Sequence, residues 1–257
     1  MNRFRGCLAV AALLGVSILS ASPASALTVF TVGKTNTLGP GGDPGVATGQ
    51  TIVDNYNNAA LATNGVPRSG TQTFGLGITE VDNGPVALYN ATIPGLAADP
   101  YGYGGNFEAL QPGGTAIFEF NGTGVKSFSA YLGSIDQYNY IDILGAGNAV
   151  IDQISGSQLL LNHYGNQSAA ITNRRVFIDG LPTGATGIEF STTGIAFEFD
   201  DIAVSDTAAM PTSPSGAVQF AAVPEPATWG MMLLGVGMIG AGMRLARRKN
   251  AAALATA

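Results

Sequence analysis

The middle of the chain, residues 27–204, is built of short runs in which apolar and polar residues alternate. The Ile-Phe-Glu-Phe run at 117–120 and the Ile-Ala-Phe-Glu-Phe run at 195–199 are the clearest examples. A two-residue period puts successive side chains on opposite faces of a β-strand. We therefore predict an all-β domain, folded as a jelly-roll-like antiparallel β-sandwich.

Turn signals separate the runs. The dipeptides Asn64-Gly65, Asn83-Gly84, Asn121-Gly122 and Asp179-Gly180 favour tight turns. Asn121-Gly122 in particular predicts a hairpin between the strands on either side of it. We expect a helix at 54–62 and strands at 27–32, 73–79, 115–120, 125–132, 138–144, 149–154, 174–178, 187–191 and 195–204.

The first 26 residues have the order of a secretory signal peptide. Arg3 and Arg5 precede an apolar run at 7–20, and small residues fill 22–26. The alternative is an uncleaved anchor, but the run is shorter than the ~20 residues that a span needs. We predict cleavage before Leu27, which would also remove Cys7, the only cysteine.

The charge of the predicted mature domain is strongly negative. Between residues 27 and 223 there are sixteen acidic residues and five basic ones, a net charge of about −11. The basic residues are Lys34, Arg68, Lys126, Arg174 and Arg175. Such a domain repels phosphate backbones, which argues against nucleic-acid binding. It fits a secreted protein or one that collects divalent cations.

The C-terminal region predicts a linker followed by a membrane tail. Residues 205–223 are rich in Ser, Thr, Ala and Pro, as flexible or extended linkers are. Residues 227–243 carry no charge, and a helix of that length rises about 25 Å, near the lower limit for crossing a bilayer. The basic cluster that follows is expected to stay in the cytoplasm. We predict one transmembrane helix at 227–243.

This tail, at 224–250, resembles the PEP-CTERM sorting signal in its PEPxxWA variant, with Gly230 where the variant has alanine. The resemblance implies processing by an exosortase, a membrane enzyme of Gram-negative bacteria that produce exopolysaccharide. It further implies a protein tethered by its membrane helix and then released to the cell surface. The residues matching the signal are Pro224, Glu225, Pro226, Trp229, Arg244, Arg247 and Arg248.

A second resemblance concerns the domain itself. Segments 125–141 and 196–204 are similar to a family of exosortase-dependent surface proteins. That family implies no activity that could be transferred to this chain. The resemblance supports the sandwich prediction and leaves the biochemical role open.

The sequence gives little support for an enzyme. His163 is the only histidine, and its Asn and Gly neighbours are typical of a turn, so a Ser-His-acid site is not expected. A glycan hydrolase needs only two carboxylates, and Glu119, Glu189 and Glu198 could supply them. The same three residues also fit the solvent face of alternating strands. We predict a non-enzymatic surface or matrix protein.

Two features suggest a ligand. Asp200 and Asp201 open the last predicted strand and offer hard oxygen ligands for calcium, although a strand end capped by one acid is the alternative. Tyrosines in or beside turns could form a shelf for exopolysaccharide sugars, or simply pack. These tyrosines are Tyr101, Tyr103, Tyr131, Tyr138 and Tyr140.

Overall fold

The computed structural model describes most of the predicted domain and little of either end. The described residues are 27–33, 45–57, 61, 63–100, 105–122, 124–159, 165–166, 171–209, 220–221, 234–239 and 244. The predicted signal peptide lies outside them, as do Pro224, Glu225, Pro226, Trp229, Arg247 and Arg248.

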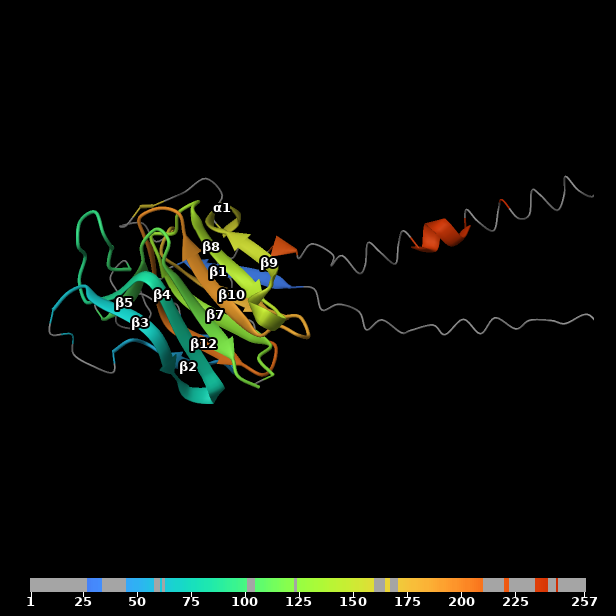
Figure 1. Ribbon diagram of the computed structural model, residues 1–257, viewed down its shortest axis with the longest axis horizontal. Helices are drawn as coiled ribbons and strands as arrows, with labels where there is room; N and C mark the ends of the chain where they lie inside the picture. Colours follow the sequence, from blue (N-terminus) through green and yellow to red (C-terminus); the bar gives the residue numbers. More distant parts are fainter. Residues whose placement is uncertain are drawn as a thin grey trace, which may run out of the picture.

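Thirteen strands of the described residues pair in one antiparallel sheet (Figure 1). Within the described part of the domain, the helical elements are single turns, η1 Gly75–Gly77, η2 Ala146–Asn148 and α1 Gly156–Leu159. The strands are β1 Thr28–Gly33, β2 Thr51–Asp54, β3 Val66–Thr73, β4 Ile78–Tyr89, β5 Phe107–Leu110, β6 Thr115–Phe120, β7 Ser127–Gly133, β8 Asn139–Leu144, β9 Val150–Ser155, β10 Arg174–Asp179, β11 Gly187–Thr192, β12 Phe197–Ser205 and β13 Phe220–Ala221.

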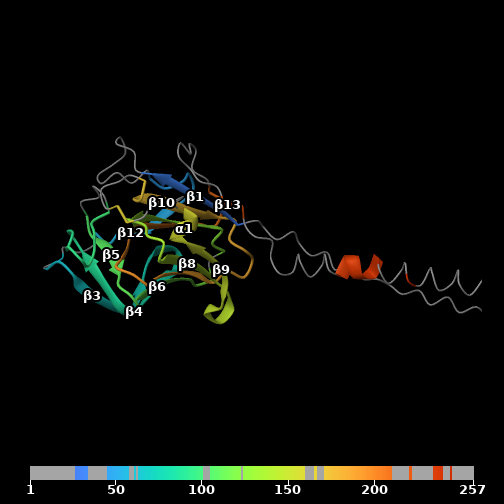
Figure 2. The same cartoon turned by 90° about the horizontal axis from the view of Figure 1, so that it is seen from above.

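The sheet curls so that its two halves face each other. Strands β13, β1, β10, β7 and β12 form one arm, and β6, β11, β8 and β9 form the other. Strands β5 and β4 carry the pairing from one arm to the other. Figure 2 shows β1 and β10 on one side, β8 and β9 on the other, and β3, β4 and β5 at the bend.

Phenylalanine rings fill the space between the arms. Phe118 of β6 lies 5.6 Å from Phe128 of β7, measured between ring centroids. Phe190 of β11 lies 4.9 Å from Phe199 of β12 in an edge-to-face arrangement. All four rings are almost fully buried. Because each pair joins opposite arms, this aromatic cluster holds the curl closed.

Two long strands change partner part-way along one edge. Strand β4 pairs with β6 up to Asn83 and with β5 from Val86 onward. Strand β12 pairs with β5 through residues 197–199 and with β2 through residues 202–204. Backbone irregularities mark both switches, since Gly84 has φ 74° and Asp201 has φ 48°. Bulges of this kind bend a strand and increase its twist, which is what a curled sheet requires.

The all-β, antiparallel prediction is confirmed, with a different arrangement of the sheet. A sandwich of two separate sheets would interrupt the pairing between layers, whereas β5 and β4 keep it continuous here. The predicted strand at 115–120 coincides with β6, and seven others agree with observed strands to within about two residues at either end.

Three local predictions were wrong. The strand expected at 73–79 instead contains the end of β3, η1 and the start of β4. In the described part of the helix expected at 54–62, Asp54 ends β2 and residues 55–57 are not helical. Asn121-Gly122 forms a turn but no hairpin, because β6 pairs with β4 and β11 while β7 pairs with β10 and β12. That turn carries the chain across the core to the opposite arm.

The C-terminal tail is described only in part. Residues 234–239 are helical, and so is the exposed Arg244. Among the tail residues and all others that the structure describes, no helix has the length and apolar character needed to cross a membrane.

The switch in β4 gives a stability prediction. A Cβ at Gly84 would lie 2.5 Å from the Gly113 carbonyl oxygen, whereas one at Gly70, which also has positive φ, would meet nothing within 4 Å. We expect Gly84→Ala to destabilise the domain by about 3 kcal/mol, and Gly70→Ala by only the ~1 kcal/mol cost of its backbone conformation. Thermal unfolding of the two variants measures the difference. Equal melting temperatures would contradict the close approach at Gly84.

Candidate functional site

The predicted calcium ligands, Asp200 and Asp201, lie where β12 changes partner. Both are buried. Asp200 Oδ1 accepts a hydrogen bond from the Asp201 N–H at 2.6 Å. The pair therefore forms a bulge in the middle of a strand, so the alternative of a strand end capped by one acid was wrong.

A buried arginine from β10 faces this bulge. Arg175 Nη2 donates a hydrogen bond to the Asp201 carbonyl oxygen at 2.9 Å and lies 3.9 Å from Asp201 Oδ2. Its Nη1 donates to Ser129 Oγ at 2.9 Å. The guanidinium thus brings a positive charge beside Asp201 and offsets part of its charge.

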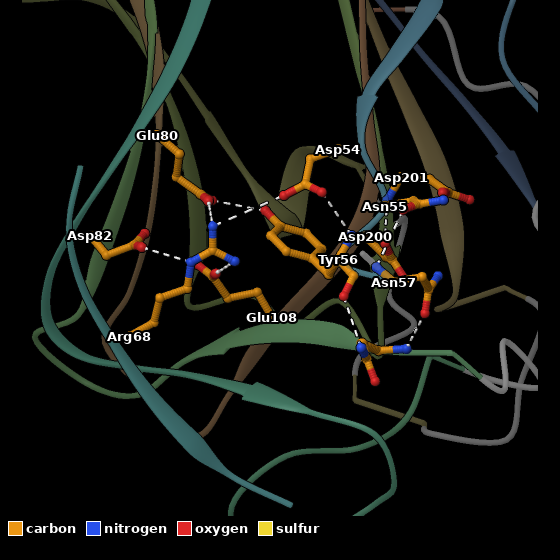
Figure 3. A network of polar contacts seen from close by, with 11 residues as sticks. Asp54, Asn55, Tyr56, Asn57, Arg68, Glu80, Asp82, Glu108, Asp200 and Asp201 are labelled. Carbon is orange, nitrogen blue, oxygen red and sulfur yellow. Dashed lines mark hydrogen bonds and ion pairs between the residues drawn. The ribbon is translucent and has the colours of Figure 1, made fainter. Parts of the chain in front are cut away.

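A second acidic cluster, around Arg68 of β3, is larger and was not predicted (Figure 3). Arg68 Nη2 lies 2.8 Å from Glu80 Oε2 and 4.0 Å from Asp54 Oδ2. Its Nε lies 3.1 Å from Asp82 Oδ2, and its Nη1 lies 3.2 Å from Glu108 Oε2. One guanidinium therefore lies within 4.0 Å of four carboxyl groups from three strands. If all four carboxyl groups ionise, the cluster has a formal net charge of −3.

Burial disfavours the ionisation of all four carboxyl groups. Desolvation raises the pKa of Glu80 to about 8 and the pKa of Glu108 well above its usual value, and Arg68 only partly opposes this. The pKa of Asp82 is raised for the same reason. The neighbouring charges of Glu80 and Asp82 raise the pKa of Glu108 further. The cluster thus holds protons at neutral pH.

Three of these acids have the spacing of a metal site. One oxygen each from Glu80, Asp82 and Glu108 can be chosen so that all lie within 4.8 Å of one another. Arg68 already places a nitrogen within 3.2 Å of an oxygen of each acid, so its guanidinium stands where a cation would bind. Tyr56 completes the packing, with its hydroxyl donating to Glu80 Oε1 at 2.8 Å and its ring 5.0 Å from the guanidinium carbon. This is an internal ion-pair network that supports the bend of the sheet.

A cleft of about 380 Å³ lies outside the aromatic core. Its polar walls come from Ser134, Asp136, Tyr138 and Glu198, and its other lining residues are Gly95, Leu96, Ala97, Ala98, Gly165, Ile195 and Ala196. Glu198 extends from β12 on the face opposite Phe197 and Phe199, while Ser134, Asp136 and Tyr138 belong to the connection between β7 and β8. The cleft therefore joins segments that are far apart in the sequence.

Glu198 is held in place by two donors. Its Oε1 accepts from the Ala98 N–H at 2.8 Å, and its Oε2 accepts from the Ser134 hydroxyl at 2.8 Å. Burial raises the pKa of Glu198 to about 7, and these two hydrogen bonds oppose the rise. At neutral pH the group is thus shared between its charged and neutral forms.

Asp136 and Tyr138 form the other polar pair of the cleft. The Tyr138 hydroxyl lies 2.6 Å from Asp136 Oδ2 and 2.5 Å from the Ile195 carbonyl oxygen, so its single proton is directed at two acceptors. Partial burial raises the pKa of Asp136. Burial and the neighbouring Asp136 also raise the pKa of Tyr138.

Three glycines allow these side chains to sit where they do. A Cβ at Gly194 would lie 2.7 Å from the Tyr138 ring, and one at Gly165 would lie 2.6 Å from Asp136 Oδ1. A Cβ at Gly133 would lie 3.1 Å from the Cβ of Glu198. Tyr138, Asp136 and Glu198 thus each pack closely on the backbone of a glycine, which fixes their positions.

The structure separates the other predicted residues. Glu119 is half-buried on β6 and accepts from Thr79 Oγ1 at 3.1 Å, while Glu189 lies opposite Asp142 on β8. Neither lines the cleft, so of the three predicted carboxylates only Glu198 does. Tyr138 is the one described tyrosine of the predicted shelf that lines it. Tyr101, Tyr103 and His163 lie outside the described residues.

Sequence reasoning missed the Arg68 cluster and misjudged Glu198. A signal for the first existed, because Glu80 and Asp82 share the two-residue period of Ile78 and so point inward with it. Glu198 is 2% exposed, although its alternation with two phenylalanines suggested a solvent-facing position. Alternation assigns a residue to a face but does not say whether that face is covered.

The raised pKa values give a pH prediction. An acid whose pKa is raised by folding binds its proton more tightly in the folded state, so its contribution to stability is fully present below about pH 4.5 and is lost as the pH rises through the folded-state pKa. With folded-state pKa values of about 8 for Glu80 and about 7 for Glu198, that loss begins near pH 4.5 and is nearly complete by about pH 8. We expect the melting temperature to be about 5 °C or more lower at pH 9 than at pH 5.

Glu80→Gln tests the origin of this effect, because glutamine cannot ionise. We expect a smaller drop in melting temperature for this variant, with Glu119→Gln behaving like the unaltered chain. Equal melting temperatures at pH 5 and pH 9 in the unaltered chain would contradict the proton-binding cluster.

The comparisons with known proteins identify the tail. A family model for the PEP-CTERM protein-sorting motif matches residues 222–249. No curated protein matches the chain. The match confirms the resemblance seen at 224–250.

Two solved structures show distant similarity to the domain. One is a glycoside hydrolase family 43 arabinoxylan arabinofuranohydrolase from Bacillus subtilis in complex with cellotetraose, with 17% identity, a TM-score of 0.31, and coverage of 59% of this chain and 30% of the enzyme. The other is the enzymatically active domain of bacteriophage CBA120 tailspike protein 4, with 14% identity, a TM-score of 0.27, and coverage of 50% and 19%. The chain thus spans less than a third of either protein. TM-scores this low support no shared fold or activity.

The functional assignment therefore rests on the tail. The chain carries the PEP-CTERM protein-sorting motif at residues 222–249, a signal that implies export and sorting by an exosortase to the cell surface.

Proposed function

We propose that the protein is a non-enzymatic component of the cell surface or extracellular matrix of an exopolysaccharide-producing Gram-negative bacterium. Its tail tethers it to the inner membrane until an exosortase-type enzyme cuts near Pro-Glu-Pro and releases or transfers the domain. The observation that carries this proposal is the match of the sorting motif to residues 222–249.

The chemistry of the tail suits that sequence of events. Pro224 and Pro226 favour an extended chain and hinder a helix from continuing outward past Trp229. An extended strip beside the membrane is what a processing enzyme must reach. The basic residues after position 243 favour a cytoplasmic end, which would leave Glu225 and the domain outside.

Mass spectrometry of the protein recovered from exosortase-containing cells tests the processing. We expect a C-terminus near 224–226 for the unaltered chain, and an intact C-terminus reaching beyond Lys249 when Pro224, Glu225 and Pro226 are all replaced by alanine. Replacing the linker residues Pro211 and Pro214 by alanine is the matched control and should leave cleavage unchanged. Recovery of the unaltered chain with its tail intact would contradict the proposal.

A carbohydrate-binding domain is the second candidate, and the cleft beside Glu198 favours it. Within this alternative the curled sheet would be a variant of the jelly-roll sandwich, since its arms face each other across one aromatic core.

A carboxylate-based glycan hydrolase is a third candidate, because Asp136 and Glu198 line one cleft. Incubation with extracted exopolysaccharide separates these two, since only a hydrolase would shorten the polymer.

Calcium at Asp200 and Asp201 stays a prediction. The loop after β2 lies beside this bulge, because Asp54 pairs with Ile202, and it could add the amide oxygen of Asn55, which accepts from the Asn57 N–H at 3.2 Å (Figure 3). Calcium takes six to eight oxygen ligands, so these groups would have to be supplemented. Arg175 offers a different way to balance Asp201, without a metal.

Thermal unfolding with and without a chelator distinguishes the two ways of balancing Asp201. If calcium is bound, chelation should lower the melting temperature by several degrees, and Asp200→Asn should abolish that sensitivity to the chelator. Asp152→Asn on β9 is the matched control and should retain it. An unchanged melting temperature in chelator would contradict the calcium prediction and leave Arg175 as the balancing charge.

A further inference from the structure

We propose that the cleft formed by segments 95–98, 134–138 and 195–198 binds an uncharged, hydroxyl-rich ligand, namely a segment of a neutral glycan. In this proposal Asp136 and Glu198 accept hydrogen bonds from sugar hydroxyls. The side chains at the mouth of the cleft contact the C–H face of a sugar ring.

The polar wall of the cleft is rich in acceptors. Each oxygen of Glu198 already accepts one hydrogen bond from the protein. A carboxylate offers about four lone-pair sites, so both oxygens retain capacity for a ligand donor. Asp136 is half-buried and receives the Tyr138 hydroxyl on Oδ2. Two carboxyl groups in one cleft can therefore accept further hydrogen bonds. Sugar hydroxyls donate hydrogen bonds and carry no charge.

The mouth of the cleft is apolar. Leu96 is 42% exposed and Ile195 is 55% exposed, which is unusual for residues of this size. The ring of Tyr138 is half-buried beside them and has a flat face supported by Gly194. An acceptor-lined interior with an aliphatic and aromatic rim matches the two sides of a sugar ring, which has hydroxyls at its edge and C–H groups on its face.

Charge selects among glycans. The cleft holds two carboxyl groups in a domain with a net charge of about −11, so uronic acid, sulfate and phosphate groups would be repelled. A divalent cation is disfavoured because burial resists full ionisation of Glu198. The size of the cleft lies within the range of small-ligand sites.

The site is also built before the ligand arrives. Gly133, Gly165 and Gly194 each leave room against one polar side chain of the cleft, and Ser134 and Ala98 fix the Glu198 carboxyl. Groups fixed in advance lose little entropy on binding.

This proposal rests on the proposed delivery to the cell surface for the source of its glycan. Binding by the purified chain does not depend on processing, so failure of one is distinguishable from failure of the other.

Isothermal titration calorimetry of the full-length chain in detergent tests the proposal. The probes are the tetrasaccharides of glucose, mannose and galactose, with tetragalacturonic acid as the anionic counterpart. We expect at least one neutral tetrasaccharide to bind with a Kd of about 1 mM or lower, and tetragalacturonic acid to bind at least tenfold more weakly, as a penalty of about 1.4 kcal/mol gives.

Variants locate the binding in the cleft. We expect Asp136→Asn to weaken the bound probe about tenfold, since a hydrogen bond to a charged acceptor is replaced by a neutral one. Ile195→Ala, at an exposed rim position, should fold normally and weaken it about threefold. Asp152→Asn and Tyr140→Phe lie outside the cleft and should bind like the unaltered chain.

Four results would overturn the proposal. They are no binding of any neutral tetrasaccharide at 10 mM, binding of tetragalacturonic acid as tight as that of the neutral probes, unchanged affinity in both Asp136→Asn and Ile195→Ala, and equal weakening in the two control variants. None of these results would affect the conclusion of the sorting experiment, because that experiment measures the position of the C-terminus and does not involve the cleft.

Discussion

The fold depends on how two long strands exchange partners. An antiparallel strand offers only two edges, yet β4 and β12 each pair with three strands, because one edge of each is divided between two neighbours. The divisions fall at Asn83-Gly84-Pro85 and at Asp200-Asp201. Pro85 cannot donate a backbone hydrogen bond, which suits it to a break in pairing. With both switches in place, the four-residue strand β5 can connect the two arms and turn a flat sheet into a curl.

Strand β12 couples this curl to both acidic sites outside the bend. Phe197 and Phe199 enter the aromatic core, while Glu198 points the other way into the cleft. Two residues later the bulge at Asp200-Asp201 meets Arg175. A shift of one residue in the register of β12 would move Glu198 into the core and a phenylalanine into the cleft. The aromatic packing that holds the arms together therefore also fixes the position of the cleft carboxyl.

Local features of the fold could be read from the sequence, and long-range ones could not. The run at 117–120 predicted β6 because alternation is a property of neighbouring residues. Asn121-Gly122 predicted a turn correctly, but the partners of β6 and β7 depend on residues far along the chain. Asn83-Gly84 has the same composition and lies inside β4 as a partner switch. A turn dipeptide reports backbone preference, and the rest of the sheet decides how that preference is used.

The candidate sites divide in the same way. The sorting motif could be identified directly, since a motif of consecutive residues needs no distant residue to complete it. Glu198 and Asp136 belong to one cleft only because β12 pairs with β7, so no local pattern could have joined them. Arg68 meets Glu80, Asp82 and Glu108 for the same reason, since β4 pairs with both β3 and β5. The function of the tail can therefore be inferred from its consecutive residues alone. Any function of the domain depends instead on the curled sheet. The cleft is the place where that sheet brings hydrogen-bond acceptors and an apolar rim together at the surface.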